Sequence, residues 1–378
     1  MSGTSRGRPD FLLLFVTMTL VGFGLLMIFS ASAPIAMIKH NSPWHYASKQ
    51  GIFALIGLFV MFFFMNIPYF WWKKAAPILL LCALFMLTLV LIFGTNINGA
   101  RRWFVLGGFN LQPAEFTKLA LIVYLSSMIS RKEERIRDFK KGLFPLFITV
   151  GILLLLIMKQ PDFGTVLILF CIAGTMIFIG GVNLRHIALL SLGLIPLFIY
   201  LAVSKSYRLV RIISFVNPID HSQGAGYQLI QSLYALGHGH ITGTGLGKSV
   251  QKLFYLPEAH TDFIFAVIGE EFGFLGSLVF LLVFFLFLWR GLKAALKCDN
   301  PLEMMLGMGI VIMIGIQFFL NIGAVTGSLP ITGVPLPFIS YGGSSLILCL
   351  ASTGILLSIS RDNHRRRLVS DERSTQNK

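Results

Sequence analysis

Long apolar runs recur along the 378-residue chain and limit its possible folds more than any other feature. Each run has about 18 to 24 residues, which is enough for one helix to cross a hydrocarbon core of about 30 Å. Within lipid, every backbone amide needs a partner in its own segment, so such a run must be helical. Hydrophobic residues form 55% of the chain and charged residues only 12%, a smaller charged fraction than in soluble domains. The sequence therefore predicts an all-α polytopic membrane protein.

We expect about ten transmembrane helices in a single membrane domain that covers residues 1–378. The polar hinge Lys159-Gln-Pro-Asp162 barely separates the fifth helix from the sixth. Between the seventh and eighth, an extracytoplasmic segment at about 205–261 is far longer than the others, and its residues 227–236 predict a short amphipathic helix. A basic cytoplasmic tail follows the last span at about 361–378. The expected spans are 11–30, 47–66, 75–94, 112–129, 143–158, 163–181, 187–204, 262–288, 304–326 and 343–360.

The net charge of +15 follows from membrane topology, and we expect no nucleic-acid partner. An even number of spans puts both termini on the same side of the membrane. The positive-inside rule makes that side the cytoplasm, because most Lys and Arg lie there. We expect Arg365–Arg367 in the tail to contact anionic headgroups. The first apolar run is too long for a cleavable signal peptide, so we expect it to remain as a span. The four cysteines are dispersed without a CxxC pair, which predicts neither a disulfide framework nor a zinc site.

This topology leaves few ionisable residues on the outer side or within the membrane. Any outward-facing acid–base chemistry must use one of the acids Glu115, Asp162, Asp220, Glu258, Asp262, Glu270 and Glu271. Positive charge on the outer side runs against the topological bias, and an anionic substrate is the simplest reason for it. The outward basic residues are Arg101, Arg102, Lys159, Lys205, Arg208, Arg211, Lys248 and Lys252.

The segment Tyr255–Gly276 carries the strongest indication of chemistry. A polar run with Glu258, His260 and Asp262 leads directly into an apolar helix. Ionisable groups at a bilayer are costly and are usually retained for a function. Asp262, at the outer rim, is best placed to act as a general base, because partial desolvation there would raise its proton affinity. The alternative is an ordinary helix N-cap, which we consider less well supported because other charged residues accompany Asp262.

Small residues in this helix and a later loop both predict close packing near Asp262. On an ideal helix, Ala266, Gly269 and Gly273 fall on nearly the same face as Asp262, so another helix or a substrate could approach closely. Residues 327–345 are rich in proline and glycine yet remain apolar. We expect them to form a loop that dips into the protein and lines or closes a cavity, with a simple packed turn as the alternative.

The outer motif Asn98–Phe104 combines adjacent arginines with an aromatic ring. Arg101 and Arg102 can form forked, charge-assisted hydrogen bonds to phosphate oxygens. Trp103 can stack on a sugar or a lipid headgroup. Taken alone, however, the motif is better explained as an interfacial ring with snorkelling arginines.

Three further charged residues begin two of the expected helices. Glu115 and Lys118 share a helix face, which favours a structural ion pair over a role in orienting substrate or a cation. Asp162 fits two interpretations equally, an N-cap or a carboxylate that faces a central cavity together with Lys159. We expect neither a transition-metal site nor an organic cofactor, because the histidines lack supporting ligands at metal-binding spacing. A hard divalent cation, Mg²⁺ or Mn²⁺, held by pyrophosphate and one or two carboxylates, is the more plausible metal.

Eight motifs, in order along about residues 9–361, together resemble the SEDS family, which includes FtsW, RodA and SpoVE. Their form is closer to FtsW and SpoVE than to RodA. His238 and His240 stand where family members usually have small residues, which would stiffen that loop. The motifs are NGARRW, QPAEFTKLA, QPDFGT, FVNP, GYQLIQSLYALG, GTGLGKSVQK, YLPEAHTDFIFAVIGEE and PLPFISYGGSSL.

The resemblance implies a ten-span peptidoglycan glycosyltransferase that polymerises lipid II during division or related wall building. It implies work at the outer face of the cytoplasmic membrane with a class B penicillin-binding protein and with other divisome or elongasome proteins. The family's essential Asp matches Asp262, and its functionally important Trp matches Trp103. Other residues that match family motifs, and that we therefore expect to bind substrate, are Arg101, Arg102, Glu115, Lys118, Asp162, Lys252 and Glu258.

As a hypothesis, Asp262 removes the proton from the 4-hydroxyl of the acceptor sugar, which then attacks the anomeric carbon of an undecaprenyl-pyrophosphate-linked glycan. Arg101, Arg102 and Lys252, or the divalent cation, would stabilise the departing pyrophosphate. Two alternatives belong to other functional classes. A lipid II flippase would line a translocation path with the same charges, and a non-catalytic scaffold for the transpeptidase would not need Asp262.

Overall fold

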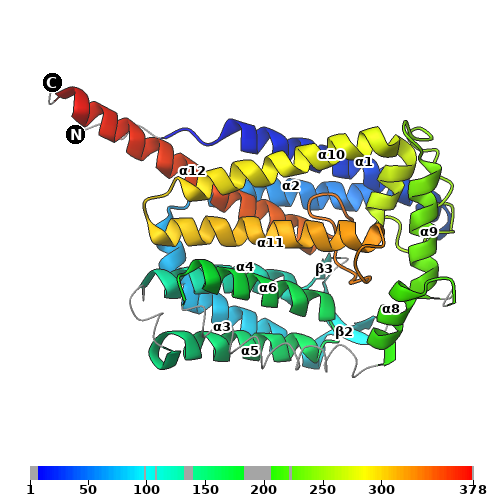
Figure 1. Cartoon of the computed structure of the whole chain (residues 1–378), viewed down its shortest axis with the longest axis horizontal. Coiled ribbons are helices and arrows are strands. Elements are labelled where there is room, and N and C mark those ends of the chain that lie inside the picture. The colour runs from blue at the N-terminus through cyan, green and yellow to red at the C-terminus, as the bar shows by residue number, and fades with distance from the viewer. Residues whose placement is uncertain are drawn as a thin grey trace.

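The computed structural model describes residues 7–97, 99–106, 109–131, 139–182, 206–220 and 224–376. Long helices run side by side along one direction, and two short helices lie across one end of the bundle (Figure 1). The helices are α1 (Phe11–His40), α2 (His45–Met65), α3 (Tyr69–Phe93), α4 (Pro113–Arg131), α5 (Phe144–Met158), α6 (Phe163–Ile179), α8 (Ser206–Val216), α9 (Ala225–His238), α10 (Ile264–Leu296), α11 (Pro301–Val325) and α12 (Gly343–Gln376). A short π-helical segment, Phe139–Leu143, precedes α5.

The expectation of a multi-pass membrane protein is confirmed. Six described helices, α1, α2, α3, α10, α11 and α12, are long and apolar enough to cross a membrane. The shorter apolar helices α5 and α6 match the fifth and sixth expected spans, and α4 matches the fourth. The seventh expected span, 187–204, lies outside the described residues. The amphipathic helix expected at 227–236 is α9.

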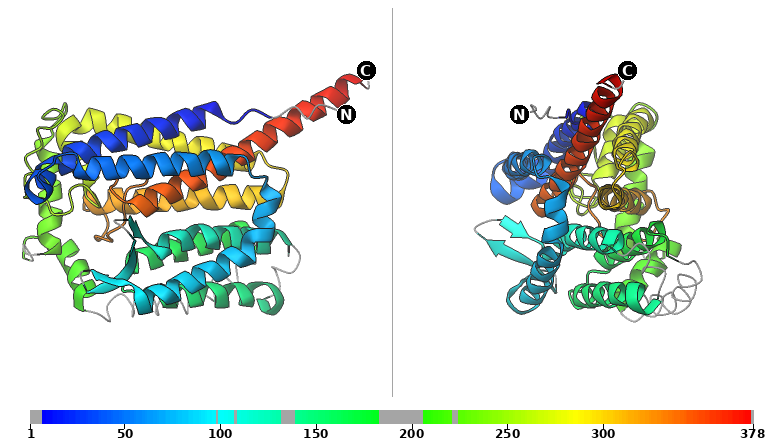
Figure 2. Two further views of the ribbon diagram at one scale, coloured as in Figure 1. Left: turned by 180° about the vertical axis from the view of Figure 1, so that it is seen from behind. Right: turned by 90° about the vertical axis from the view of Figure 1, so that its left-hand side faces the viewer.

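Two details differ from the expectation. The segment 361–376, expected as a tail, continues α12, which projects beyond the bundle at the end that holds both termini (Figure 2). Part of the expected outer loop between α3 and α4 forms a small antiparallel sheet, so the all-α description is incomplete there. The strands are β1 (Thr95–Ile97), β2 (Ala100–Leu106) and β3 (Phe109–Leu111), in the order β1-β2-β3.

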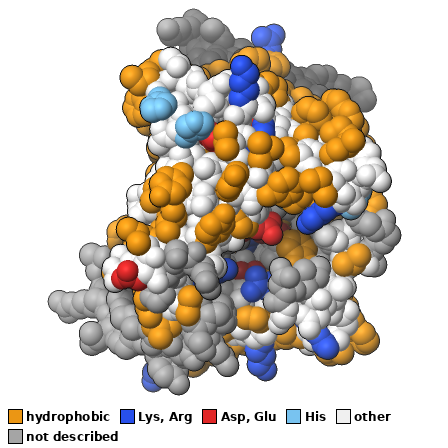
Figure 3. Space-filling view, turned by 90° about the vertical axis from the view of Figure 1, so that its right-hand side faces the viewer, with side chains coloured by type: hydrophobic (Ala, Val, Ile, Leu, Met, Phe, Trp, Pro, Cys, Tyr) orange, Lys and Arg blue, Asp and Glu red, His pale blue; other side chains and the backbone are white. Residues whose placement is uncertain are grey.

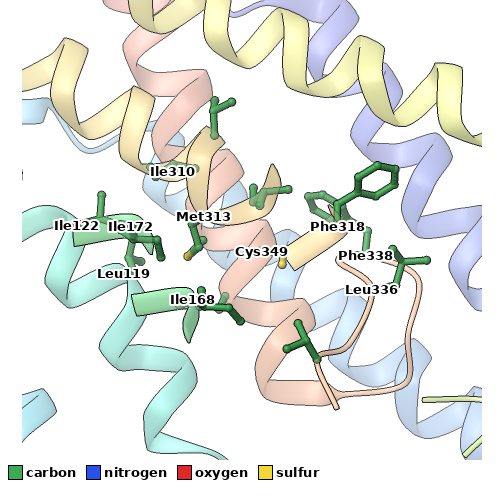
Figure 4. Packing of buried hydrophobic residues seen from close by; sticks show 14 of the residues in the cluster. Leu119, Ile122, Ile168, Ile172, Ile310, Met313, Phe318, Leu336, Phe338 and Cys349 are labelled. Atoms are coloured by element: carbon green, nitrogen blue, oxygen red, sulfur yellow. The ribbon is translucent and has the colours of Figure 1, made fainter. Parts of the chain in front are cut away.

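Helices α11 and α12 form the interior of the bundle. Of their apolar stretches, 67% and 72% are buried, against 28% for α3. Figure 4 shows Ile310 and Met313 of α11 beside Ile122 of α4 and Ile172 of α6. These side chains belong to one continuous core of buried residues, which holds the polar end of the bundle in place.

Helix α10 is broken close to its beginning. Gly273 has φ 65° and ψ −165°, outside the helical region, so the ideal helix expected here is wrong at this residue. The loop after α9 supplies partners for the freed backbone groups. The amide of Thr244 donates to the carbonyl of Glu270 at 3.0 Å. In the other direction, the amide of Phe274 donates to the carbonyl of His240 at 2.9 Å.

The expected close approach at the small residues of this helix is found at Gly269. A Cβ atom there would lie 2.4 Å from Cδ2 of Leu236, on α9. A larger side chain here would require the Leu236 side chain to shift, because real Cβ contacts are not that short. The glycine therefore seats α9 against α10, and a helix rather than a substrate occupies this face.

Candidate active site

Two adjoining cavities of ≈ 320 and ≈ 300 Å³ lie at the end of the bundle where α8 and α9 cross. Figure 3 shows acidic and basic side chains together in a hollow on this end face, surrounded by apolar side chains. Four residues line both cavities: Arg102, Asp162, Asp262 and Gly333. The first cavity continues between α6, α8 and the loop after α11, and the second runs toward α4 and the start of α12.

Asp262 lies in the turn that precedes α10, outside the spanning helix. The N-cap interpretation is wrong, because Phe263 occupies the N-cap position and makes no side-chain capping bond. Among the described residues, no hydrogen bond ends on the Asp262 carboxylate. Its backbone carbonyl accepts a bond of 2.7 Å from Nδ2 of Asn321, which also donates to the carbonyl of Val334 at 2.8 Å. Asn321 therefore joins this turn, α11 and the following loop through backbone carbonyls, without a hydrogen bond to the Asp262 carboxylate.

The surroundings of Asp262 raise the pKa of its carboxyl from 3.8 to about 6. Burial is the largest cause, because removal from water disfavours the charged form. The negative charges of Glu258 and Asp162 act in the same direction, and the positive charge of Arg211 opposes them. A carboxylate with this pKa is ionised at neutral pH and still binds a proton well, which suits a general base.

The loop 327–342 forms the wall opposite Asp262. As expected, it is a non-helical segment that dips into the protein, with Leu336, Phe338 and Ile339 fully enclosed. Ser340 fastens it to the Asp262 turn, because its hydroxyl donates to the carbonyl of Thr261 at 2.6 Å. The interpretation that this loop lines a cavity is therefore confirmed over the simple packed turn.

Gly333 in this loop lies beside two charged groups, and its backbone conformation favours glycine. Its φ is 71°, in the left-handed region, and a Cβ there would lie 3.4 Å from Oδ2 of Asp262. The same Cβ would lie 3.9 Å from a terminal nitrogen of Arg211. That guanidinium, on α8, donates to the carbonyl of Ile331 at 3.3 Å. Arg211 was not among the predicted site residues, and its only sequence signal was its place among the outward basic residues.

The two adjacent arginines of β2 do not meet the same group. Successive residues of a strand point to opposite faces, so their guanidinium groups diverge. Arg102 lies at the cavities, where it donates to the carbonyl of Gln160 at 2.8 Å and to that of Pro161. Arg101 is turned toward the end of α3, where it donates to the carbonyl of Ile92 at 3.3 Å. Trp103 lines the second cavity, as a sugar-stacking residue would.

Asp162 combines both of its sequence interpretations. One oxygen caps α6 by accepting the amide of Thr165 at 3.1 Å, and the other accepts Nε2 of Gln112 at 3.2 Å. The carboxylate also lines both cavities. Lys159, its expected companion, lines neither cavity. Asp162 thus holds the start of α6 while placing negative charge near Asp262.

The expected ion pair between Glu115 and Lys118 is present. Lys118 Nζ lies 2.7 Å from Oε1 of Glu115 and donates to Oε1 of Gln317 at 3.0 Å. Both members line the second cavity, although Lys118 is only 1% exposed. Glu258 lines the same cavity, and its carboxylate accepts the hydroxyl of Thr261 at 2.8 Å. These residues surround the space that Asp262 faces.

Lys252 was expected to bind substrate, but the structure places it away from both cavities. Its Nζ lies 2.6 Å from Oε1 of Glu271 and 3.0 Å from the hydroxyl of Ser30 on α1. The physical reason is burial: Glu271 is 1% exposed, and a buried carboxylate needs a charged partner. The neighbouring Glu270 is also enclosed, and Nδ1 of His238 lies 2.9 Å from its Oε1.

Protein side chains alone do not form a metal cage in the described part of the chain. No group of three or more His, Cys, Asp or Glu side chains is placed to hold an ion there. Four acidic side chains line the second cavity: Glu115, which is paired with Lys118, and Asp162, Glu258 and Asp262. A hard cation at this wall would need further oxygen ligands from a bound molecule, as Mg²⁺ commonly does.

Comparison with known proteins bears directly on this arrangement. The cell cycle protein family of FtsW, RodA and SpoVE matches residues 11–365. The stage V sporulation protein E of Bacillus subtilis is 44% identical over 360 residues, which cover 95% of this chain and 98% of that protein. The probable peptidoglycan glycosyltransferase FtsW of Geobacter sulfurreducens is 42% identical over 356 residues, which cover 93% of this chain and 95% of that protein.

Two solved structures share the fold. One is a chain of a peptidoglycan synthase complex, studied for the structural coordination of polymerization and crosslinking. It has a TM-score of 0.77 and 29% identity, and the match covers 94% of this chain and 98% of that chain. The rod shape determining protein RodA of Thermus thermophilus has a TM-score of 0.70 and 27% identity, covering 94% of this chain and 97% of that chain. The resemblance read from the motifs is confirmed, and the chain belongs to the SEDS family of FtsW, RodA and SpoVE proteins.

Proposed function

We propose that this protein is a peptidoglycan glycosyltransferase that polymerises lipid II into glycan strands during cell division or a related wall-building process. Relatives at 40–44% identity include proteins named for this activity, and a solved relative belongs to a peptidoglycan synthase complex. The observation that carries the chemistry is the Asp262 carboxylate, which lines the cavities, accepts no described hydrogen bond and has a pKa raised to about 6.

In the proposed step, the Asp262 carboxylate takes the proton of the acceptor sugar's 4-hydroxyl as that oxygen attacks the anomeric carbon of the lipid-linked glycan. A carbon–oxygen bond forms on one face of the carbon. The bond to the pyrophosphate breaks on the other face, and undecaprenyl pyrophosphate leaves with the electron pair. A single carboxylate is sufficient for this inversion, because no second one has to act as nucleophile.

The departing pyrophosphate develops negative charge that the cavity must stabilise. Arg102 and Arg211 take this role in our proposal, because both line the first cavity beside Asp262. Arg211 replaces Lys252 from the sequence-based hypothesis. Trp103, Glu115, Lys118 and Glu258 line the second cavity, where we place the sugars of the acceptor.

A bound Mg²⁺ or Mn²⁺ would supply further positive charge. We propose that pyrophosphate oxygens and the carboxylates of the second cavity hold it together, since the protein groups alone do not enclose an ion. Chelation by EDTA should then stop glycan formation, and added Mg²⁺ or Mn²⁺ should restore it. Full activity in chelator would remove the cation from the mechanism.

We further propose that a class B penicillin-binding protein binds this chain and crosslinks the new strands. The support is the solved relative, which is part of a complex that couples polymerization to crosslinking. The proposed topology places both termini in the cytoplasm, which puts the Asp262 cavity at the outer membrane face beside its lipid-linked substrate.

Fluorescent lipid II in liposomes containing purified protein tests the function directly. A glycosyltransferase makes long glycan that a muramidase digests, and it needs no ion gradient. A flippase moves labelled lipid II between leaflets without making polymer, and a scaffold does neither. Parallel reactions with and without the transpeptidase separate an intrinsic activity from one that requires the partner. Absence of polymer under both conditions would overturn the proposal.

A further inference from the structure

The largest unexplained basic feature lies at the end of the bundle opposite Asp262. A cavity of ≈ 410 Å³ is enclosed by the start of α1, the end of α10 and the middle of α12. Helix α10 begins beside Asp262 and has 33 residues, about 50 Å if it were straight, which exceeds a hydrocarbon core of about 30 Å, so we place the two sites at opposite surfaces of a bilayer. The charged residues that line the cavity are Arg8, Asp10, Arg290, Lys293, Lys297 and His364.

The single acid of this cavity does not neutralise its positive charge. Asp10 caps α1, because its Oδ1 accepts the amides of Leu12 and Leu13 at 3.1 and 3.0 Å. Its Oδ2 lies 2.7 Å from a terminal nitrogen of Arg290. The lining thus holds four cationic side chains, Arg8, Arg290, Lys293 and Lys297, against one carboxylate, a balance of charged groups that favours an anion.

One hydrogen-bond donor of the lining lacks a partner among the described residues. Among the described residues, Nε of Arg290 is buried without a hydrogen-bond partner. His364, also in the lining, accepts the amide of Arg8 at Nδ1, at 3.4 Å, and so ties the segment before α1 to α12. A buried donor without a partner is costly, and a ligand oxygen would remove that cost.

Apolar side chains at the same opening favour a lipid as the carrier of the anion. Phe11 and Leu12 line the cavity and are 63% and 40% exposed. Trp289, next to Arg290, is 63% exposed, and tryptophan rings of this kind sit at the headgroup level of a membrane. A phosphate in the cavity would thus be attached to chains that contact the exposed side of α1.

We propose that this cavity binds the phosphate of an anionic phospholipid headgroup at the membrane surface opposite the Asp262 site. Arg290, Lys293 and Lys297 hold the phosphate oxygens, and Phe11 and Leu12 contact the acyl chains. Binding here joins three helices that are distant in sequence and fixes the end of α10, the helix that begins beside Asp262. This site is independent of the proposed glycosyltransferase activity.

Native mass spectrometry of protein extracted from equal mixtures of phosphatidylglycerol and phosphatidylcholine tests the proposal. The wild type should retain phosphatidylglycerol preferentially. Lys293→Gln combined with Lys297→Gln should weaken that retention about 30-fold, at about 1 kcal/mol for each lysine near an anionic surface. Lys73→Gln combined with Lys74→Gln is the matched control and should change it little, because neither residue lines the cavity.

A second measurement uses only wild-type protein, in case the variant folds poorly. In nanodiscs of phosphatidylglycerol, Lys293 and Lys297 should be acetylated several-fold more slowly than in phosphatidylcholine, with a smaller change at Lys73 and Lys74. Any one of three results would overturn the proposal. The wild type could retain both lipids equally, the control variant could lose as much retention as the Lys293 and Lys297 variant, or all four lysines could be protected equally. Displacement of the lipid by millimolar inorganic phosphate or glycerol phosphate would instead assign the cavity to a water-soluble phosphate and overturn the lipid source.

Discussion

The acids on either side of the start of α10, Asp262 and the pair Glu270 and Glu271, differ in how they are bonded. Glu270 accepts the amide of Val250 at 2.9 Å and the hydroxyl of Ser249, and Glu271 pairs with Lys252 at 2.6 Å. The carboxylate of Asp262 accepts no hydrogen bond among the described residues and lines two cavities. The carboxylates of the pair are bonded within the protein, whereas that of Asp262 has no hydrogen-bond partner among the described residues.

In the proposed mechanism, this difference separates structural acids from a reactive one. Glu270 and Glu271 fasten the loop 238–252 across the break at Gly273, so their charges serve the geometry of the helix start. That geometry then positions the Asp262 turn against Asn321 and the loop after α11. The contrast can be tested, because removal of a structural acid should affect stability, and removal of the reactive one should affect the chemistry.

The largest effect is expected for Asp262→Asn. Loss of a general base should lower the rate of glycan formation by about 10²–10⁴-fold. Because the folded carboxyl has a pKa of about 6 against 3.8 when unperturbed, its ionisation lowers stability as pH rises from about 4 to about 6. The variant should therefore unfold no more readily than the wild type at pH 8, measured by denaturation in detergent. Asp220→Asn, at an exposed acid outside the cavities, is the matched control and should retain full activity.

Among single changes to the structural acids and their partners, Lys252→Met should reduce stability most. It leaves Glu271 buried without a cation, a change that commonly costs about 3–5 kcal/mol of unfolding free energy. Lys248→Met, at an exposed lysine of the same loop, should cost little. Adding Glu271→Met to Lys252→Met should recover much of the loss. A stable Lys252→Met protein with no activity would contradict the division between the two groups.

Glu270→Gln should have an intermediate effect. The amide keeps one acceptor oxygen but replaces the other with a donor, which conflicts with the amides and hydroxyl that now bond to the carboxylate. We expect a loss of about 1–3 kcal/mol in unfolding free energy. The rate of glycan formation, measured below the unfolding temperature, should fall far less than in the Asp262 variant. An equal fall in rate would place Glu270 in the chemistry.

The smallest expected effect is a pH dependence of the wild-type rate. A base with a pKa of about 6 is mostly protonated at pH 5 and mostly ionised at pH 7, so the rate should rise about tenfold over this range. Glu258→Gln removes a negative neighbour and should move the midpoint to lower pH. Arg211→Gln removes a positive neighbour and should move it to higher pH. Midpoints that do not move in these directions would show that another group controls the profile.

Much of the helical framework could be predicted from apolar run length, because lipid leaves a long uncharged segment few alternatives to a helix. The small sheet at β1–β3 was missed, since strands of three to seven residues carry little periodic signal. The break at Gly273 was missed for a different reason. Only the packing of the loop after α9 makes a left-handed glycine favourable there.

The candidate site was predicted in part. Asp262, Arg102 and Trp103 line the cavities, as do Asp162, Glu115, Lys118 and Glu258. Arg101 and Lys252 matched the same motifs but bond elsewhere, and Arg211 took a place that no motif assigned. Motifs identify residues by their neighbours in the chain. Which side chains share a cavity depends on helices that lie far apart in sequence.

The amino-acid sequence by itself determined the membrane class, the order of the spans and the family of this protein. The reason is that hydrophobic length and residue order act locally along the chain. Only the tertiary structure decided how these acids are bonded. The partners of Glu270 and Glu271 come from α1 and the loop 238–252. The neighbours of Asp262 include Arg211 of α8 and Gly333 of the loop after α11. Burial and bonding partners set the chemistry of a carboxylate, and both depend on how those distant segments fold together.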